Sequence, residues 1–159
     1  MSEVAASDHH DGPVYSPGVW GFIKHWFFTT NHKDIGKLYM LISLLMFFVG
    51  GSMALVIRTE LFHPGLTFVQ PNFFNQMTTM HGLIMLFGVI MPAFTGLANL
   101  QIPMMIGAPD MALPRINNFG FWILPFAFTL LASTLFMDGG GPNFGWTMYA
   151  PLSTTYAPP

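Results

Sequence analysis

The sequence contains no cysteine and few charged side chains. Of its 159 residues 8% are charged, with five Lys or Arg against seven Asp or Glu. The absence of cysteine excludes disulfides, thiolate metal sites and covalent haem attachment through a Cys-x-x-Cys-His motif. A formal net charge of −2, without a run of basic residues, argues against nucleic acid as a partner. A soluble domain carries about a quarter charged residues, so this composition is that of a membrane protein.

The first 37 residues form the polar part of the chain. Residues 1–18 combine Gly, Pro and polar residues without an apolar period, and they predict a mobile tail that is not a signal peptide. Residues 19–37 contain the segment Trp20–Phe28 (WGFIKHWFF), which mixes aromatic rings with Lys24 and His25. Aromatic rings and lysine head groups both favour the membrane–water interface, so we expect an interfacial segment there.

Three apolar stretches are long enough to cross a membrane as helices. They cover residues 38–57, about 74–100 and 119–137. At 1.5 Å per residue, a helix of about twenty residues spans roughly 30 Å, the thickness of the hydrocarbon core. Pro92 predicts a bend near Gly88, because proline removes a backbone hydrogen bond, and three prolines in residues 101–118 exclude one continuous helix there. We therefore expect an all-α membrane domain over residues 38–159.

The basic residues indicate the orientation of these spans. Lys24, Lys33 and Lys37 precede the first span and Arg115 precedes the third, so alternating spans place all four on one side of the membrane. Arg58 falls on the other side. The positive-inside rule predicts that the side with the lysines, including the interfacial segment, is cytoplasmic.

His81 is the only ionisable side chain between His63 and Asp110, and it lies inside the second apolar span. A polar ring in lipid needs a partner, which makes such a residue a functional candidate. The sequence leaves two interpretations open: a histidine hydrogen-bonded to a neighbouring helix, or the ligand of a haem or metal ion. The adjacent Gly82 would let a flat group lie close to the backbone.

The same orientation places polar groups at both membrane faces. Arg58 ends the first span and His81 lies about two turns into the second, so both lie toward the outer face. Asn99, Asp110 and Asn117 lie at the inner face. A metal-capable ring near a cation at one depth, with polar groups leading in from the other side, suggests movement of charge across a bilayer.

Each of these groups also has a plainer interpretation. Arg58 could extend to the outer interface, as a lone arginine at a helix end commonly does. Asp110 could be a loop carboxylate paired with Arg115, and Asn117 could cap the third helix.

Four segments, in order and spacing, resemble subunit I of the haem–copper oxidases. They are Thr30–Gly36 (TNHKDIG), Ile57–Leu61 (IRTEL), Met80–Gly82 (MHG) and Ile106–Asn118 (IGAPDMALPRINN). The first and last strings resemble the aa3-type cytochrome c oxidase branch more closely than the quinol oxidases. The resemblance extends from about Phe27 to Leu152.

The resemblance implies a role for three residues toward the outer face. His81 resembles the first axial ligand of the low-spin haem a. Arg58 matches the arginine that hydrogen-bonds the formyl group of that haem, where a cation would raise the haem potential. Trp146 resembles the tryptophan whose indole N–H meets a propionate of the second haem.

It also implies a proton path and an ion site. Asp110, Asn99 and Asn117 match the entrance of the proton-uptake path called the D channel. Oxygen ligands in the loop after the first span resemble an outer-face site for calcium or sodium, since such ligands suit hard cations. The residues of that candidate site are Glu60, His63 and Gly65.

The function implied by the resemblance is that of a proton-pumping oxidoreductase of the respiratory chain. Electrons would pass from cytochrome c through haem a to a haem–copper centre that reduces O₂ to water. The family fold has twelve helices, so we expect this chain to be an N-terminal fragment, inactive alone, that supplies helices I–III. The second haem and copper are expected in the full-length protein, with membrane lipid around it and subunits II (carrying dinuclear copper) and III as partners.

Two other functions remain open from the sequence. One is subunit I of a quinol oxidase, which would take electrons from a quinol. The other is a haem-free membrane scaffold or transporter whose three spans only pack together. The polar tail ahead of the NHKDIG string is more typical of bacterial than of mitochondrially encoded members, which favours a bacterial inner membrane.

Overall fold

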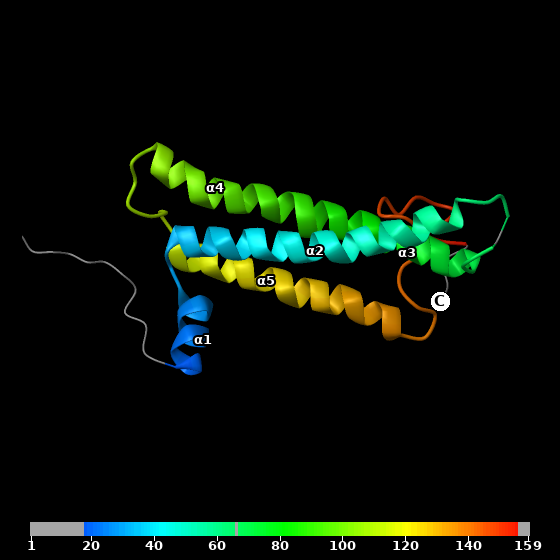
Figure 1. The fold of residues 1–159 in the computed structure, drawn as a ribbon, viewed down its shortest axis with the longest axis horizontal. Helices are drawn as coiled ribbons and strands as arrows, with labels where there is room; N and C mark the ends of the chain where they lie inside the picture. Colours follow the sequence, from blue (N-terminus) through cyan, green and yellow to red (C-terminus); the bar gives the residue numbers. More distant parts are fainter. Residues whose placement is uncertain (1–17, 66, 156–159) are drawn as a thin grey trace, which may run out of the picture.

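The computed structural model describes residues 18–65 and 67–155, which contain helices and no strand. The elements are α1 (Val19–Phe28), α2 (His32–Glu60), α3 (Pro71–Leu83), the π-helix η1 (Ile84–Ile90), α4 (Met91–Met105), α5 (Pro114–Ser133) and the 3₁₀-helix η2 (Thr134–Phe136). The predicted tail, residues 1–18, lies outside the described residues apart from Gly18. α3, η1 and α4 form one continuous rod, which runs antiparallel to α2 and to α5 (Figure 1).

Three helical stretches are long and apolar enough to cross a membrane, which confirms the predicted all-α fold with three spans. They are His32–Glu60, Pro71–Met105 and Pro114–Phe136. Because the three run in alternating directions, the starts of α2 and α5 lie at the same end of the molecule (Figure 1). Lys33, Lys37 and Arg115 therefore share one end, and Arg58 lies at the other.

α2 begins earlier than the apolar run at residue 38 suggested. Its N-cap is Asn31, whose side-chain oxygen accepts the backbone N–H of Lys33 at 2.9 Å, and Asp34 lies in the first turn. The predicted interfacial segment 19–37 is thus divided into α1, a break at residues 29–31 and the first turns of α2. Hydropathy marks the part of a helix that suits lipid, whereas capping determines where the helix starts.

α1 is fastened to the ends of both α2 and α5. His25 Nε2 lies 3.2 Å from the Asp34 carboxylate at the start of α2. Phe27 stacks on Trp122 of α5 with ring centroids 4.0 Å apart, and the Trp122 indole N–H donates to the Phe27 carbonyl at 3.2 Å. α1 itself buries no residue, so its apolar side chains remain open to a membrane surface. Its interfacial position stays a prediction.

The second span accommodates Pro92 through a stretch of wider turns, and the predicted bend near Gly88 stays a prediction. The π-helix η1 precedes it, and the backbone N–H of Met91 bonds to the Leu86 carbonyl five residues earlier. Because proline lacks an N–H, a local shift from α to π hydrogen bonding lets the helix continue past Pro92. Further on, α4 passes through Pro103 and ends at Met105, and α5 starts with Pro114 at its first turn.

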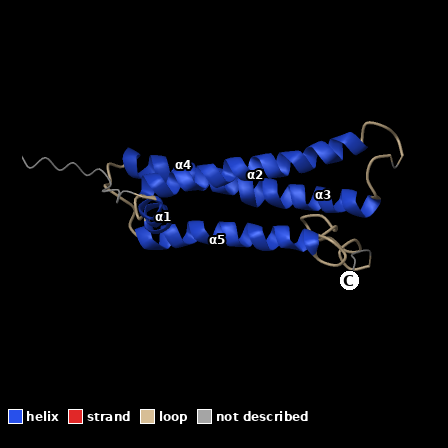
Figure 2. Cartoon of the chain, turned by 60° about the horizontal axis from the view of Figure 1, so that its bottom comes forward, coloured by secondary structure: helices blue, strands red, loops and turns tan. Residues whose placement is uncertain are grey.

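α2 is the central element of the packing. It packs along α3, η1 and α4, and contacts α5 chiefly through its first half. There Ile35, Tyr39 and Ile42 of α2 form the buried core with Phe121 of α5. Figure 2 shows α5 running beside the other two long helices with a visible separation along much of its length.

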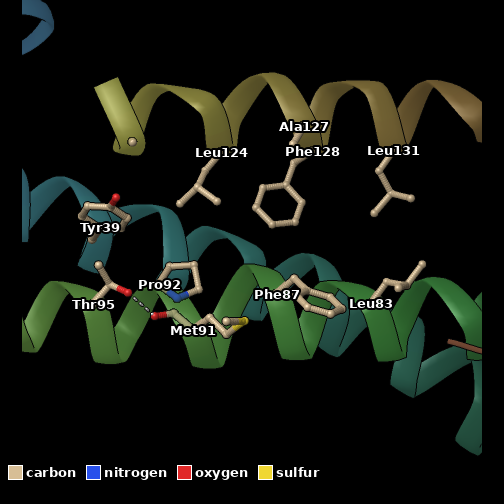
Figure 3. A pocket seen from close by; sticks show the side chains of 11 residues that line it. Tyr39, Leu83, Phe87, Met91, Pro92, Thr95, Leu124, Ala127, Phe128 and Leu131 are labelled. Atoms are coloured by element: carbon tan, nitrogen blue, oxygen red, sulfur yellow. Dashed lines mark hydrogen bonds between the residues drawn. The ribbon is translucent and has the colours of Figure 1, made fainter. Parts of the chain in front are cut away.

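An apolar cavity of about 490 Å³ lies between α5 and the η1–α4 rod (Figure 3). Leu124, Phe128 and Leu131 face it from α5, and Leu83, Phe87 and Met91 face it from the opposite side. The hydroxyl of Thr95 at its edge is bonded to the Met91 carbonyl at 2.9 Å. None of the site residues predicted from the sequence lines this cavity, so the candidate chemistry lies at the two ends of the molecule.

Candidate functional site

His81 projects from α3 toward α2. Its Nδ1 lies 2.8 Å from the backbone carbonyl oxygen of Gly50, and the ring is partly buried. A carbonyl oxygen only accepts hydrogen bonds, so Nδ1 carries a proton, and in the neutral ring the lone pair is then on Nε2. A backbone carbonyl that holds the other ring nitrogen is the usual support of a metal-ligating histidine, because it sets both tautomer and ring orientation.

Gly50 makes this contact possible because α2 and the second span approach very closely there. A Cβ at Gly50 would lie 2.8 Å from the Met85 sulfur and 3.2 Å from a methyl carbon of Ile84. Next to it, Gly51 has no atom within 4 Å of the place where its Cβ would be. One glycine is therefore needed for helix packing, and the other leaves open space on the helix surface.

Arg58 is not brought to His81. It lies eight residues beyond Gly50, about 12 Å further along α2. Its side chain is exposed, with the guanidinium carbon 5.4 Å from the centre of the Phe62 ring. Within the described residues Arg58 has no carboxylate partner. The guanidinium therefore has a cation–π contact and free N–H donors, which fits both an interfacial arginine and one that awaits a ligand.

Trp146 lies against the helix that carries His81, a contact the sequence did not predict. A Cβ at Gly82 would lie 3.4 Å from Cδ1 of the Trp146 indole, so the ring rests on the helix backbone at ordinary contact distance. The remaining surface of Trp146 is open, with 50% of the residue exposed. Below, the three residues Arg58, His81 and Trp146 are called the His81 group.

Glu60 ends α2 as a buried carboxylate with 5% exposure. Its two oxygens accept the backbone N–H groups of Thr67, Phe68 and Val69 at 3.1, 2.8 and 2.9 Å. Glu60 thereby ties the loop after α2 back to the helix end. Glu60, His63 and Gly65 do line one hollow of about 520 Å³. However, the described residues contain no group of three or more His, Cys, Asp or Glu that could hold a metal ion.

Asn99 is the centre of a polar cluster at the other end of the molecule. It is buried, with 3% exposure, and its side-chain oxygen accepts a hydrogen bond from the Asn117 amide at 2.7 Å. This bond joins α4 to α5. Asn117 lies inside α5, whose N-cap position is Leu113, so the interpretation of Asn117 as a helix cap is wrong.

Asp110 joins the same cluster from the loop between α4 and α5. Its Oδ1 accepts the backbone N–H of Met111 at 2.7 Å and that of His32 at 3.3 Å. Among the described residues, the ion pairs are His25–Asp34 and Lys37–Asp34. Asp110 is therefore not paired with Arg115. Asp110 remains partly exposed, which gives its carboxylate access to water.

His32 is the member of the cluster to which sequence reasoning gave no role. Its Nδ1 donates to the backbone carbonyl of Asn99 at 2.8 Å, and the ring is buried with 3% exposure. Pro103 explains why this carbonyl is available, because proline has no N–H to bond the carbonyl four residues earlier. A proline four residues after Asn99 was the signal in the sequence. His32, Asn99, Asp110 and Asn117 are called the polar cluster below.

The comparisons with known proteins agree on one family. The family model described as "Cytochrome C and Quinol oxidase polypeptide I" matches residues 34–159. The cytochrome c oxidase subunit 1 of Corynebacterium diphtheriae is 47% identical over 131 residues, which cover 82% of this chain and 23% of the relative. That of Corynebacterium glutamicum is 50% identical over 125 residues, covering 79% of this chain and 21% of the relative.

A relative from another genus gives the same result. The putative cytochrome c oxidase subunit 1-beta of Streptomyces avermitilis is 43% identical over 142 residues, which cover 89% of this chain and 25% of the relative. The chain thus spans about a quarter of the length of the curated relatives that it matches.

Proposed function

The chain belongs to the cytochrome c and quinol oxidase polypeptide I family, and on that premise we propose that it works as the N-terminal part of a cytochrome c oxidase subunit I. The complete subunit would pass electrons from cytochrome c through haem a to a haem–copper centre that reduces O₂ to water, and would pump protons. Subunits II and III are its proposed partners, and a bacterial inner membrane is its proposed location. The bacterial relatives named cytochrome c oxidase subunit 1 support this proposal.

The observation that carries the proposal is the hydrogen bond from His81 Nδ1 to the Gly50 carbonyl. In the neutral ring this bond directs the lone pair to Nε2, at a partly buried position in a membrane helix. This nitrogen would suit the role of a ligand of the low-spin haem iron. When bound, haem a would supply one-electron transfer. The residues of this chain would orient the ligand ring and exclude water from it.

Arg58 and Trp146 are proposed to contact the haems rather than the iron. A guanidinium at the formyl edge would stabilise the reduced, more electron-rich haem and so raise its potential. The indole N–H of Trp146 would donate to a propionate of the second haem. Both side chains keep free N–H donors on exposed surface, as that role requires.

The polar cluster is proposed to be the entrance of the proton-uptake path. Asp110 would collect a proton from water, because its carboxylate is partly exposed. Asn99 and Asn117 would hold ordered water beside it, since an amide both donates and accepts hydrogen bonds without taking the proton. His32 would hold α2, α4 and the loop between α4 and α5 together, because it bonds to Asn99 of α4 and to Asp110 of that loop.

Cation binding at Glu60, His63 and Gly65 stays a prediction. The three residues line one hollow, which supports it. The bonds that Glu60 accepts from three backbone N–H groups give the carboxylate a structural role that does not need an ion. Calcium or sodium binding to the complete subunit, compared with Glu60→Gln, would separate the two roles.

Reduced-minus-oxidised absorption spectra of the purified complete subunit test the proposal. We expect a low-spin haem a band together with O₂ consumption driven by reduced cytochrome c. A spectrum without any haem band would overturn the oxidase assignment and favour a membrane scaffold or transporter. Oxidation of a quinol in place of cytochrome c would identify the quinol oxidase branch instead.

A further inference from the structure

The segment that follows α5 returns to α3 and is bonded to one face of it. Figure 1 shows this orange-to-red segment beside the α3 end of the molecule. The α3 residues involved are Asn72, Gln76 and Thr79, whose spacings of four and three place them on one helix face. Their partners are Asn143 Nδ2 at 2.6 Å, the Gly139 carbonyl at 3.1 Å and the Gly145 backbone N–H at 2.9 Å, respectively. Three successive bonds thus hold residues 139–145 along α3.

Thr79 makes the last and best-buried of these bonds. The residue is 1% exposed, and its hydroxyl donates to the Asn75 carbonyl at 2.8 Å while it accepts from the Gly145 N–H. Gly145 has a φ of +78°, a conformation that L side chains rarely adopt. The hydrogen bond from the Gly145 N–H to Thr79 and the left-handed conformation of Gly145 together set the direction of the chain toward Trp146.

Trp146 then lies on the next position of the same helix face. Gly82 follows Thr79 by three residues, and the indole rests on it at the contact distance given above. His81 is two residues from Thr79, which is a rotation of about 200° around the helix. It accordingly faces the other way, toward Gly50 of α2. One short stretch of α3 therefore directs His81 toward α2 and holds Trp146 on a different face of the helix.

We infer that Thr79 is a positioning residue, which fixes Trp146 relative to the helix that carries His81. The inference deepens the proposed function and, for its haem part, rests on it. If His81 binds one haem and Trp146 contacts the second, then the relative placement of these two contacts is set within four residues of α3. The hydroxyl of Thr79 is the group that links the loop to that stretch.

Amide hydrogen exchange of the complete subunit tests the link directly. In Thr79→Val the Gly145 N–H loses its acceptor, so we expect the amides of residues 145 and 146 to exchange about tenfold faster. Thr78→Val is the matched control, since the exposed Thr78 hydroxyl makes the equivalent bond to the Phe74 carbonyl at 2.9 Å and none to the loop. Thr79→Ser keeps the hydroxyl and should exchange like wild type.

A second variant covers the case in which Thr79→Val does not accumulate. Gln76→Ala removes the bond to the Gly139 carbonyl at the other end of the loop, and should raise exchange over residues 139–146 about threefold. Unchanged exchange in Thr79→Val, or in Gln76→Ala where Thr79→Val does not accumulate, would overturn the inference whether or not the subunit binds haem.

The haem part has a separate readout in the same proteins. We expect Thr79→Val to shift the absorption band and the redox potential of the second haem. The band of the low-spin haem that His81 would bind should persist. Thr79→Ser should show the wild-type band and potential of the second haem. Faster exchange with unaltered haem signals would show that the loop is held by Thr79 but that Trp146 contacts no haem, which overturns the functional part. A wild-type subunit without haem would refute the proposed function alone.

Discussion

The polar groups at the two ends of the molecule are engaged in different ways. In the polar cluster the side chains bond to one another and to protein backbone, and the bonds join α2, α4, α5 and the loop between the last two. In the His81 group, the contacts described above leave each residue with a donor or lone pair for a further partner. Arg58 rests on a ring, Trp146 on a glycine, and His81 on a carbonyl.

This is the difference that we expect between groups that act on water and groups that hold a cofactor. A path for protons needs polar side chains in mutual contact, so its partners are present in the protein itself. A cofactor site instead needs side chains that are oriented by the protein yet still have bonding capacity left. The contrast would disappear if the His81 group were only packing, and the following predictions test it, from the largest expected effect to the smallest.

Replacing His81 should have the largest effect. In the complete subunit His81→Leu removes the proposed iron ligand, and no other histidine lies in the second span, Pro71–Met105. We expect complete loss of the low-spin haem a band and block of electron transfer to the oxygen site. Thr78→Val on the same helix should leave the spectrum unchanged. A normal low-spin spectrum in His81→Leu would show that the histidine serves packing alone.

Asp110 should decide whether the polar cluster moves protons. Asp110→Asn keeps the size and hydrogen-bonding shape of the side chain but cannot carry the proton, so we expect turnover to fall sharply and pumping to stop while both haems and copper assemble. Asp110→Glu should largely preserve activity, because protonation is the task. Proton release by reconstituted vesicles after an oxygen pulse measures this. Unimpaired pumping in Asp110→Asn would make Asp110 a structural loop residue.

His32 should affect stability more than it affects the haems. His32→Phe leaves the buried Asn99 carbonyl without its donor. We expect the free energy of unfolding to fall by about 1–3 kcal/mol, which is the usual penalty for an unpaired buried polar group. Chemical denaturation of the complete subunit in detergent measures the change. Lys33→Met, at the neighbouring exposed position, should change stability by less than about 0.5 kcal/mol. Equal free energies of unfolding for His32→Phe and wild type would show that the hydrogen bond from His32 to the Asn99 carbonyl does not stabilise the cluster.

Arg58 should give the smallest effect. Arg58→Met removes a cation but no iron ligand, so we expect a shifted haem a band and a lower potential with the iron retained. Phe62→Leu is the control, because it removes the ring beneath the guanidinium and keeps the charge. Spectroelectrochemistry of the two variants measures both quantities. An unchanged potential in Arg58→Met would place this arginine at the membrane interface only.

Much of the fold could be predicted from local sequence. The apolar runs at residues 38–57 and 74–100 lie within the helical stretches His32–Glu60 and Pro71–Met105, and the run at 119–137 ends one residue beyond the stretch Pro114–Phe136. The helix ends were less predictable. α2 starts at His32 because Asn31 caps it, and hydropathy carries no information about capping.

The candidate site was also only partly predictable. The family resemblance pointed to His81, Asn99, Asp110 and Asn117, and in the structure the last three join one cluster through His32. The sequence did not indicate that His32 is the group that joins Asn99 to Asp110. Nor did it indicate that Trp146 would rest on Gly82.

The sequence by itself determined the number of spans, their alternation and the residue types available at each depth, because helix formation and lipid preference are local properties. Tertiary structure alone decided the hydrogen-bond partners. His81 bonds to a carbonyl 31 residues away, His32 to one 67 residues away, and Thr79 to an amide 66 residues away. These pairs form only when the helices and the loop after α5 are packed together. Gly50 allows the close approach at His81, and Pro103 leaves the Asn99 carbonyl free for His32.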